Sequence, residues 1–170
     1  DAAMQFTRHK TIQWKVFQNS AAYLSDPSQS PDYFHYTPEN SRRFRALPSW
    51  FTLMAYGKEG YREIVERNCA AAKYFGELIE RSGGFRLLAP VRMNVVCFTF
   101  SEEIQRQEDI RIFLQAVRDD GRVFFTPTVY KGTPAIRAAI ANWLTKNEDM
   151  ELAVEVLSSV LHRIRTVSTP

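Results

Sequence analysis

Residues 32–50 (DYFHYTPENSRRFRALPSW) combine more chemically active side chains than any other segment of this chain. They include two tyrosines, a histidine and three arginines, among them Tyr33, His35, Arg42 and Arg43. Guanidinium groups grip carboxylates and phosphates, often through two parallel hydrogen bonds. Because these side chains lie where a turn-rich loop gives way to a helix, the segment predicts a site for a ligand or a partner.

The arginines allow two interpretations. Arginines beside an aromatic ring can pair phosphates and stack bases, as in a nucleic-acid site. Glu39 beside the cluster, a net charge of only +3 and the lack of a second basic run argue against nucleic acid. Arginines in the first turn of a helix would face the positive end of its dipole. We therefore expect carboxylates or a bound anion to hold them.

Arg137 lies in residues 135–140 (AIRAAI), an otherwise apolar strand. An unpaired charge is costly to bury, so this pattern predicts a partner for the guanidinium. A structural carboxylate and a substrate carboxylate both remain open.

Several other kinds of site find no support. His9 and His162 have no carboxylate or thiol at the spacing of metal ligands, and there is no GxGxxG, P-loop or GxSxG motif. Cys69 and Cys97 lack CxxC spacing, and we expect buried free thiols in a reducing, cytoplasmic setting. Neither a membrane-spanning run nor a signal peptide is expected.

Length and composition predict one domain. A chain of 170 residues with 45% hydrophobic side chains can bury a sizeable core. Its 22 basic and 19 acidic residues are too balanced to indicate an anionic partner. The chain starts at Asp1 with a strand-like run over residues 2–7, which suggests a piece of something longer.

The first half should be mainly helical. A brief helix or extended turn is expected near residues 12–17, followed by a turn-rich loop, either a lid or a solvated linker, over residues 20–38. A helix should begin at residue 40 or 41, be disturbed by Pro48, and end at Gly57 and Gly60. The strongest helical pattern runs from Glu59 to about Glu80.

The second half mixes strands and helices. Strands are expected at residues 85–88, 93–100, 123–126 and 135–141, with a turn at Lys131 and Gly132. A helix containing Ile110 and Val117 should close at Gly121, and a capping box from Thr145 to Glu148 should open the last helix. The order predicts an α+β fold, a mainly antiparallel sheet of three to four strands with helices on one face.

Several of these motifs together resemble one known family. They are residues 32–36 (DYFHY), 38–47, 50–53, 56–60, 94–98, and the Arg137 strand running on through Asn142 and Thr145 to Asp149. This pattern resembles the C-terminal half of the group II pyridoxal-phosphate-dependent amino-acid decarboxylases. That family includes the aromatic-L-amino-acid, histidine, glutamate and diaminobutyrate decarboxylases. The similarity covers nearly the whole chain.

The resemblance implies a small C-terminal domain of a fold-type-I enzyme, in which pyridoxal 5'-phosphate takes up the electrons released as carbon dioxide leaves. It divides the chain into a remnant of the large cofactor domain (1–19), a mobile catalytic loop (20–38), connecting helices (39–83) and the small domain (84–170). The family also implies a homodimer, a small-molecule amino-acid substrate, and a loop that closes over the other subunit's site.

The resemblance carries residue roles as well. Tyr33 matches the tyrosine of the family's mobile loop and is expected to donate a proton; His35 shares the loop and is expected to help position it. Arg42 and Arg43 match paired arginines that anchor the helix start and the subunit contact. Arg137 matches the arginine that binds the substrate α-carboxylate in the glutamate decarboxylase branch.

The resemblance also implies that some of the site is absent. The family's Schiff-base lysine should fall a few residues before Asp1, and the pair His9–Lys10 does not have its sequence context. The residues that bind the cofactor are likewise expected outside this chain, so the chain alone should be inactive. A non-catalytic dimerisation or binding module that kept the family's shape is the alternative.

Overall fold

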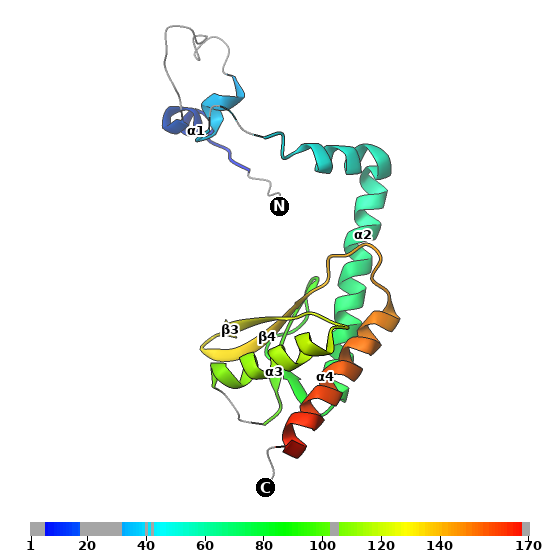
Figure 1. Cartoon of the computed structure of the whole chain (residues 1–170). Coiled ribbons are helices and arrows are strands. Elements are labelled where there is room, and N and C mark those ends of the chain that lie inside the picture. Colours follow the sequence, from blue (N-terminus) through cyan, green and yellow to red (C-terminus); the bar gives the residue numbers. More distant parts are fainter. Residues whose placement is uncertain (1–5, 18–31, 40, 42, 103–105, 168–170) are drawn as a thin grey trace. The chain divides into compact units, whose positions relative to one another are not determined.

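The chain divides after Gly57 into two units, Asp1–Gly57 and Lys58–Pro170. Figure 1 labels their elements and colours them along the sequence. The computed structural model describes residues 6–17, 32–39, 41, 43–102 and 106–167. The elements are α1 (Lys10–Phe17), the 3-10 helix η1 (Tyr33–Tyr36), α2 (Leu47–Arg81), β1 (Phe85–Leu87), β2 (Val95–Phe100), α3 (Gln107–Asp120), β3 (Thr126–Tyr130), β4 (Thr133–Ala139) and α4 (Asn147–Val167).

The first unit contains α1 and η1, which pack against each other. The helix expected near residues 12–17 is confirmed as α1. Of the strand expected over residues 2–7, the described residues Phe6 and Thr7 are not in a strand, and residues 2–5 lie outside the described residues. The loop predicted over residues 20–38 is described only from residue 32 onward.

Helix α2 begins later than predicted and is interrupted only once. It starts at Leu47 and not at residue 40 or 41, so Pro48 falls in the first turn, where a missing N–H breaks no helical hydrogen bond. Gly57 leaves the helical conformation (φ 63°, ψ −168°), whereas Gly60 remains helical. The predicted end at Gly60 is therefore wrong, because only Gly57 takes a conformation that requires glycine.

The second unit contains a four-stranded sheet in the order β1-β2-β4-β3, with every neighbouring pair antiparallel. This confirms the predicted α+β fold. The strand predicted at residues 123–126 lies further along, because the tight turn at Lys131 and Gly132 pairs Tyr130 with Thr133. That register assigns residues 126–130 to β3 and starts β4 at Thr133.

The helices cover one face of this sheet, as predicted. Val96 and Phe98 of β2 and Ile136 of β4 are fully buried in one core with side chains of α2, α3 and α4. Phe98 is central to that core: its ring centroid lies 5.9 Å from Phe75, 5.6 Å from Phe85 and 6.1 Å from Phe125, each in an edge-to-face arrangement.

The helix ends agree in part with the sequence. Gly121 closes α3 in the left-handed conformation (φ 82°), as expected. The predicted capping box from Thr145 to Glu148 is wrong, because α4 starts at Asn147 and the Lys146 amide donates to Asp149 Oδ2 at 2.8 Å. The side chain that caps α4 thus lies one residue further along. Among the described helices, none is long and apolar enough to cross a membrane.

Candidate functional site

Tyr33 and His35 lie together in the turn η1, with opposite exposures. Tyr33 is 94% exposed, whereas His35 is completely buried. The His35 amide donates to the Asp32 carbonyl at 3.0 Å, and the Asp32 amide donates back to His35 Nδ1 at 3.0 Å. The turn therefore holds its histidine inside and presents its tyrosine to the surroundings.

Helix α1 packs against this turn and forms a hydrogen bond to it. The Gln13 side-chain amide donates to the Tyr36 carbonyl at 2.9 Å, a bond between residues 23 positions apart. The sequence predicted α1 but assigned no partner to Gln13, and nothing in the local pattern could have indicated one. The ring of His35 also lies against Phe34, with centroids 4.1 Å apart.

Two buried nitrogens of the first unit lack hydrogen-bond partners. They are Trp14 Nε1 and His35 Nε2, neither of which reaches an acceptor among the described residues. Because an indole N–H can only donate, Trp14 keeps an unused donor in α1. Buried polar atoms of this kind are uncommon in folded proteins, so they mark the surroundings of η1 as a place where a group from elsewhere could bind.

Arg43 and Arg45, which follow the turn, are not part of a helix. Arg42 lies outside the described residues, and Arg43 is exposed, with its carbonyl accepting the Arg45 amide at 2.7 Å. Since α2 begins only at Leu47, the expectation that these arginines oppose a helix dipole in its first turn is wrong for Arg43. Arg43 therefore needs no carboxylate or anion to offset a helix dipole.

Arg137 belongs to the second unit and is exposed, contrary to the prediction of a buried charge. Strand alternation places it on the sheet face opposite the helices, because its neighbours Ile136 and Ala138 both point into the core. It is level with Cys97 of β2 and Thr126 of β3. Among the described residues no carboxylate forms an ion pair with it, and an exposed guanidinium needs none.

The same sheet face contains Cys97, a half-buried free thiol. Burial raises the pKa of Cys97 above that of an ordinary thiol, and the positive charge of Arg137 partly opposes that rise. The expectation of a buried free thiol is thus partly met, since the side chain is only half covered.

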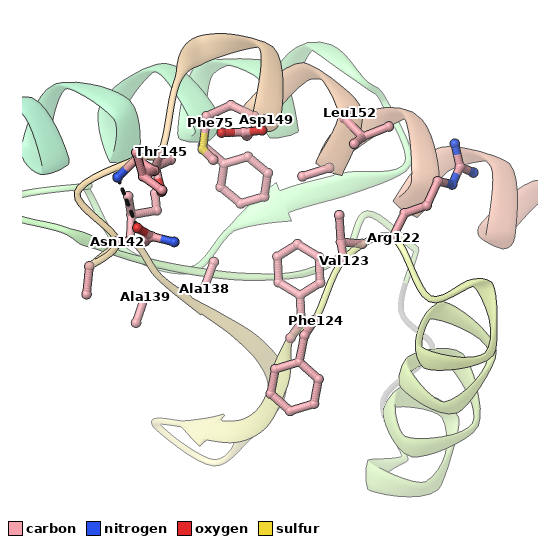
Figure 2. A pocket seen from close by; sticks show the side chains of 16 residues that line it. Phe75, Arg122, Val123, Phe124, Ala138, Ala139, Asn142, Thr145, Asp149 and Leu152 are labelled. Atoms are coloured by element: carbon pink, nitrogen blue, oxygen red, sulfur yellow. Dashed lines mark hydrogen bonds between the residues drawn. The ribbon is translucent and has the colours of Figure 1, made fainter.

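An open cleft of about 610 Å³ lies in the second unit between the segment 122–125, the end of β4 and the start of α4 (Figure 2). Figure 2 shows Asn142 and Thr145 at one end of it and Arg122 at the other. Two of its polar side chains already have partners. Asn142 Oδ1 accepts the Leu144 amide at 3.0 Å, and Arg122 binds Asp120 at 2.7 Å and Glu155 at 3.4 Å.

These pairings limit what the cleft can bind. The hydrogen bond from Arg122 holds the pKa of the Asp120 carboxyl below its usual range, because the two side chains form an ion pair. No cluster of histidine, cysteine and acidic side chains suited to a metal ion occurs in the part of the chain that the structure describes.

The fold defines the class of protein. The four-stranded antiparallel sheet, covered by helices on one face and following a long helix, has the same fold as part of solved pyridoxal-phosphate-dependent decarboxylase structures. The structure of mouse CSAD in its apo form superposes with a TM-score of 0.72 over 91% of this chain and 34% of that one, at 16% identity.

The chain belongs to the pyridoxal-dependent decarboxylase family, whose conserved domain matches residues 1–101. It is 32% identical to the aromatic-L-amino-acid decarboxylase of Drosophila simulans, over 92% of this chain and 34% of that protein. It is also 32% identical to the 3,4-dihydroxyphenylacetaldehyde synthase of Drosophila melanogaster, over 79% of this chain and 26% of that protein. The chain thus spans about a third of the length of the curated relatives it matches.

Pyridoxal phosphate is the cofactor of this family, but the described residues do not form a site for it. Such a site needs a lysine for the covalent link and donors for the phosphate. Lys10 and Lys15 are exposed on α1, and Arg122, in the cleft of the second unit, is already paired with Asp120 and Glu155.

Proposed function

We propose that this chain is the lid loop and small domain of an enzyme that removes carbon dioxide from an L-amino acid and leaves the amine. Membership of the decarboxylase family supports the reaction, and the names of the relatives support an aromatic substrate. The observation that carries the proposal is the hydroxyl of Tyr33, presented almost wholly outward by a turn that is fixed internally.

The chemical role of Tyr33 follows from the reaction. When the bond to the carboxylate breaks, its electron pair stays with the α-carbon, and that carbon must receive a proton to become the amine product. Tyr33 supplies this proton from its hydroxyl, forming the new C–H bond, and the phenolate then regains a proton from water. General acid catalysis of this kind contributes about 10² to 10⁴ in rate.

Three arginines have supporting roles in the proposal. Arg137 binds a carboxylate, since its guanidinium is exposed and has no ion pair among the described residues. Arg42 and Arg43 anchor the segment before α2 and a subunit contact. The enzyme works as a cytoplasmic homodimer, which is consistent with the free thiols of Cys69 and Cys97.

Exposed apolar side chains support the subunit contact. The first half of α2 leaves five large ones uncovered within the first unit, which is more than a solvated helix needs. They are Trp50, Phe51, Leu53, Met54 and Tyr56. The same side chains would also serve the alternative, a non-catalytic dimerisation or binding module. The two are told apart by the encoding sequence upstream of Asp1, where the enzyme requires a lysine in the family's cofactor motif.

Substitution Tyr33→Phe tests the proposal in the protein that contains this chain together with its cofactor-binding portion. We expect amine formation to fall by about 10² to 10⁴ while binding of the substrate is kept. The matched control is Tyr36→Phe, which removes the same atom three residues further along the turn and should leave the rate unchanged. Amine, aldehyde and carbon dioxide are measured together, because one relative is named as an aldehyde synthase. Normal amine formation by Tyr33→Phe would contradict the role of Tyr33.

A further inference from the structure

The two ends of the cleft in the second unit differ in the charge that they offer to a bound molecule (Figure 2). Arg122, at one end, is already neutralised by Asp120 at 2.7 Å and Glu155 at 3.4 Å. Asp149 also lines the cleft and is exposed, and it forms no ion pair within the described part of the chain. The cleft therefore offers a carboxylate for a cation, but no guanidinium for an anion.

The carboxylate of Asp149 has one oxygen in use and one to spare. Oδ2 accepts the Lys146 amide at 2.8 Å, and no hydrogen bond to Oδ1 occurs among the described residues. Neutral polar groups lie close by in the chain, because the Asn142 carbonyl accepts the Thr145 amide at 3.2 Å. Asn142 Oδ1 accepts the Leu144 amide at 3.0 Å, which leaves the NH₂ group of that side chain. Oδ1 of Asp149 is the charged acceptor that an ammonium group, with three N–H donors, prefers.

The rest of the lining is mainly apolar. Five of the lining side chains are apolar and almost completely buried: Phe75, Phe125, Ile140, Met150 and Ala153. Phe124 and Leu144 line the same cleft and are exposed. Apolar and aromatic lining with a few polar groups is typical of sites for small molecules, and aromatic rings pack well against such side chains.

Helix α4 brings the carboxylate and the apolar lining together. Leu152 and Ala153 follow Asp149 by three and four residues, so all three lie on one face of the helix and line the cleft. Four residues of an α-helix rise about 6 Å. That rise is comparable to the separation of the ammonium group and the ring in an arylalkylamine with a two-carbon chain. The small side chain of Ala153 leaves room for a ring at that level.

We propose that this cleft binds an arylalkylamine, with its ammonium group donating to Asp149 Oδ1 and its ring against the apolar lining. The volume of about 610 Å³ lies within the usual range of small-molecule sites, about 300 to 1,000 Å³. The inference depends on the cleft alone and not on the proposed function. If the proposed reaction acts on an aromatic amino acid, its amine product belongs to the class of molecule that the cleft binds.

Methionine methyl signals provide a direct test of binding at this cleft. The protein that contains this chain is labelled with ¹³C at its methionine methyl groups and titrated with 2-phenylethylamine. Met150 lines the cleft, whereas Met93 does not and is exposed. We expect the Met150 signal to shift saturably, with a Kd below about 1 mM, and the Met93 signal to stay in place. Substitutions Met150→Leu and Met93→Leu identify the two signals.

Two variants of neighbouring residues in α4 test the carboxylate. Asp149→Asn removes the charge but keeps an oxygen that can accept the Lys146 amide, so the start of the helix remains capped. Glu148→Gln removes a charge one residue earlier, from an exposed side chain that does not line the cleft. We expect Asp149→Asn to weaken binding of 2-phenylethylamine by at least about 10-fold, and Glu148→Gln by less than about 2-fold.

A second compound tests the sign of the charge in the unaltered protein. 3-Phenylpropionate has the same ring and chain but ends in a carboxylate, and we expect it to leave the Met150 signal unchanged. This comparison decides the question if Asp149→Asn does not fold.

Three results would overturn the inference. They are an unshifted Met150 signal with 2-phenylethylamine, equal affinities in Asp149→Asn and the unaltered protein, and tighter binding of 3-phenylpropionate than of the amine. None of these measurements involves turnover. Normal amine formation by Tyr33→Phe would therefore contradict the proposed function and leave the binding results as they are.

Discussion

Two glycines in α2 provide a sensitive test of the structure, because they lie three residues apart and have opposite roles. Gly57 has φ 63° and ψ −168°, while Gly60 keeps the helical conformation of its neighbours. Residues other than glycine pay about 1 to 3 kcal/mol to adopt the conformation of Gly57. An added Cβ there meets nothing within 4 Å, so the cost is backbone strain alone.

The same substitution at Gly60 should have the opposite sign. Alanine in a helix interior is favoured over glycine by about 0.5 to 1 kcal/mol, since it loses less conformational entropy on folding. We therefore expect Gly57→Ala to lower the free energy of unfolding and Gly60→Ala to raise it. Their difference should be about 1.5 to 4 kcal/mol.

Urea unfolding followed by circular dichroism at 222 nm measures both variants under the same conditions. The far-ultraviolet spectrum of the folded Gly57→Ala protein provides a second observation. An increase in helical signal would show that alanine removes the break in α2. Equal free energies of unfolding for the two variants would refute the conformation assigned to Gly57.

Two further predictions concern the second unit. Phe98→Ala should lower the free energy of unfolding by about 3 to 5 kcal/mol, because it leaves a cavity in the aromatic core. Phe124→Ala, at a ring that is 68% exposed, should lower it by less than about 1 kcal/mol. Urea unfolding measures both variants, and similar losses would contradict the burial of Phe98. Arg122 holds the pKa of Asp120 below its usual value, so its contribution to stability is present above the unfolded-state pKa and is lost as pH falls through the folded pKa. Asp120→Asn should therefore weaken the pH dependence of the melting temperature in acid, and an unchanged acid profile would mean that the pair with Arg122 is not formed in solution.

The sequence predicted the parts of the fold that depend on neighbouring residues. Gly121 ends α3 because a glycine after an amphipathic run adopts the left-handed conformation easily. The turn at Lys131 and Gly132 was also predicted, and the structure confirms it: both residues adopt positive φ, at 48° and 83°. The strand before it was misplaced, because register depends on which residues pair across the turn and not on local β-propensity.

The candidate site was harder to predict than the fold. The motif at residues 32–36 made Tyr33 and His35 candidate site residues, but it could not indicate which of them would be buried. Tyr33 and His35 have similar polar character, and only the packing of α1 on η1 distinguishes them. The role of Gln13 was invisible for the same reason, since its partner Tyr36 is 23 residues away.

The prediction that Arg137 is buried was wrong, because it relied on the composition of its strand. Its alanine and isoleucine neighbours suggested a strand buried on both faces, which would require a partner for the charge. In the structure the helices cover only the face that contains Ile136 and Ala138, so Arg137 lies on the opposite face and is exposed. Alanine occurs on either face of a sheet, so the sequence of β4 did not indicate which of its positions would be buried and which exposed.

The sequence by itself therefore determined the family and the order of the elements. These depend on residue types at fixed spacing, which the chain carries whatever its surroundings. Only the tertiary structure decided that His35 is buried while Tyr33 is exposed, that Arg137 faces away from the core, and that α2 breaks at Gly57 alone. Burial and orientation depend on which elements pack together, and that contact is made between segments far apart in the chain.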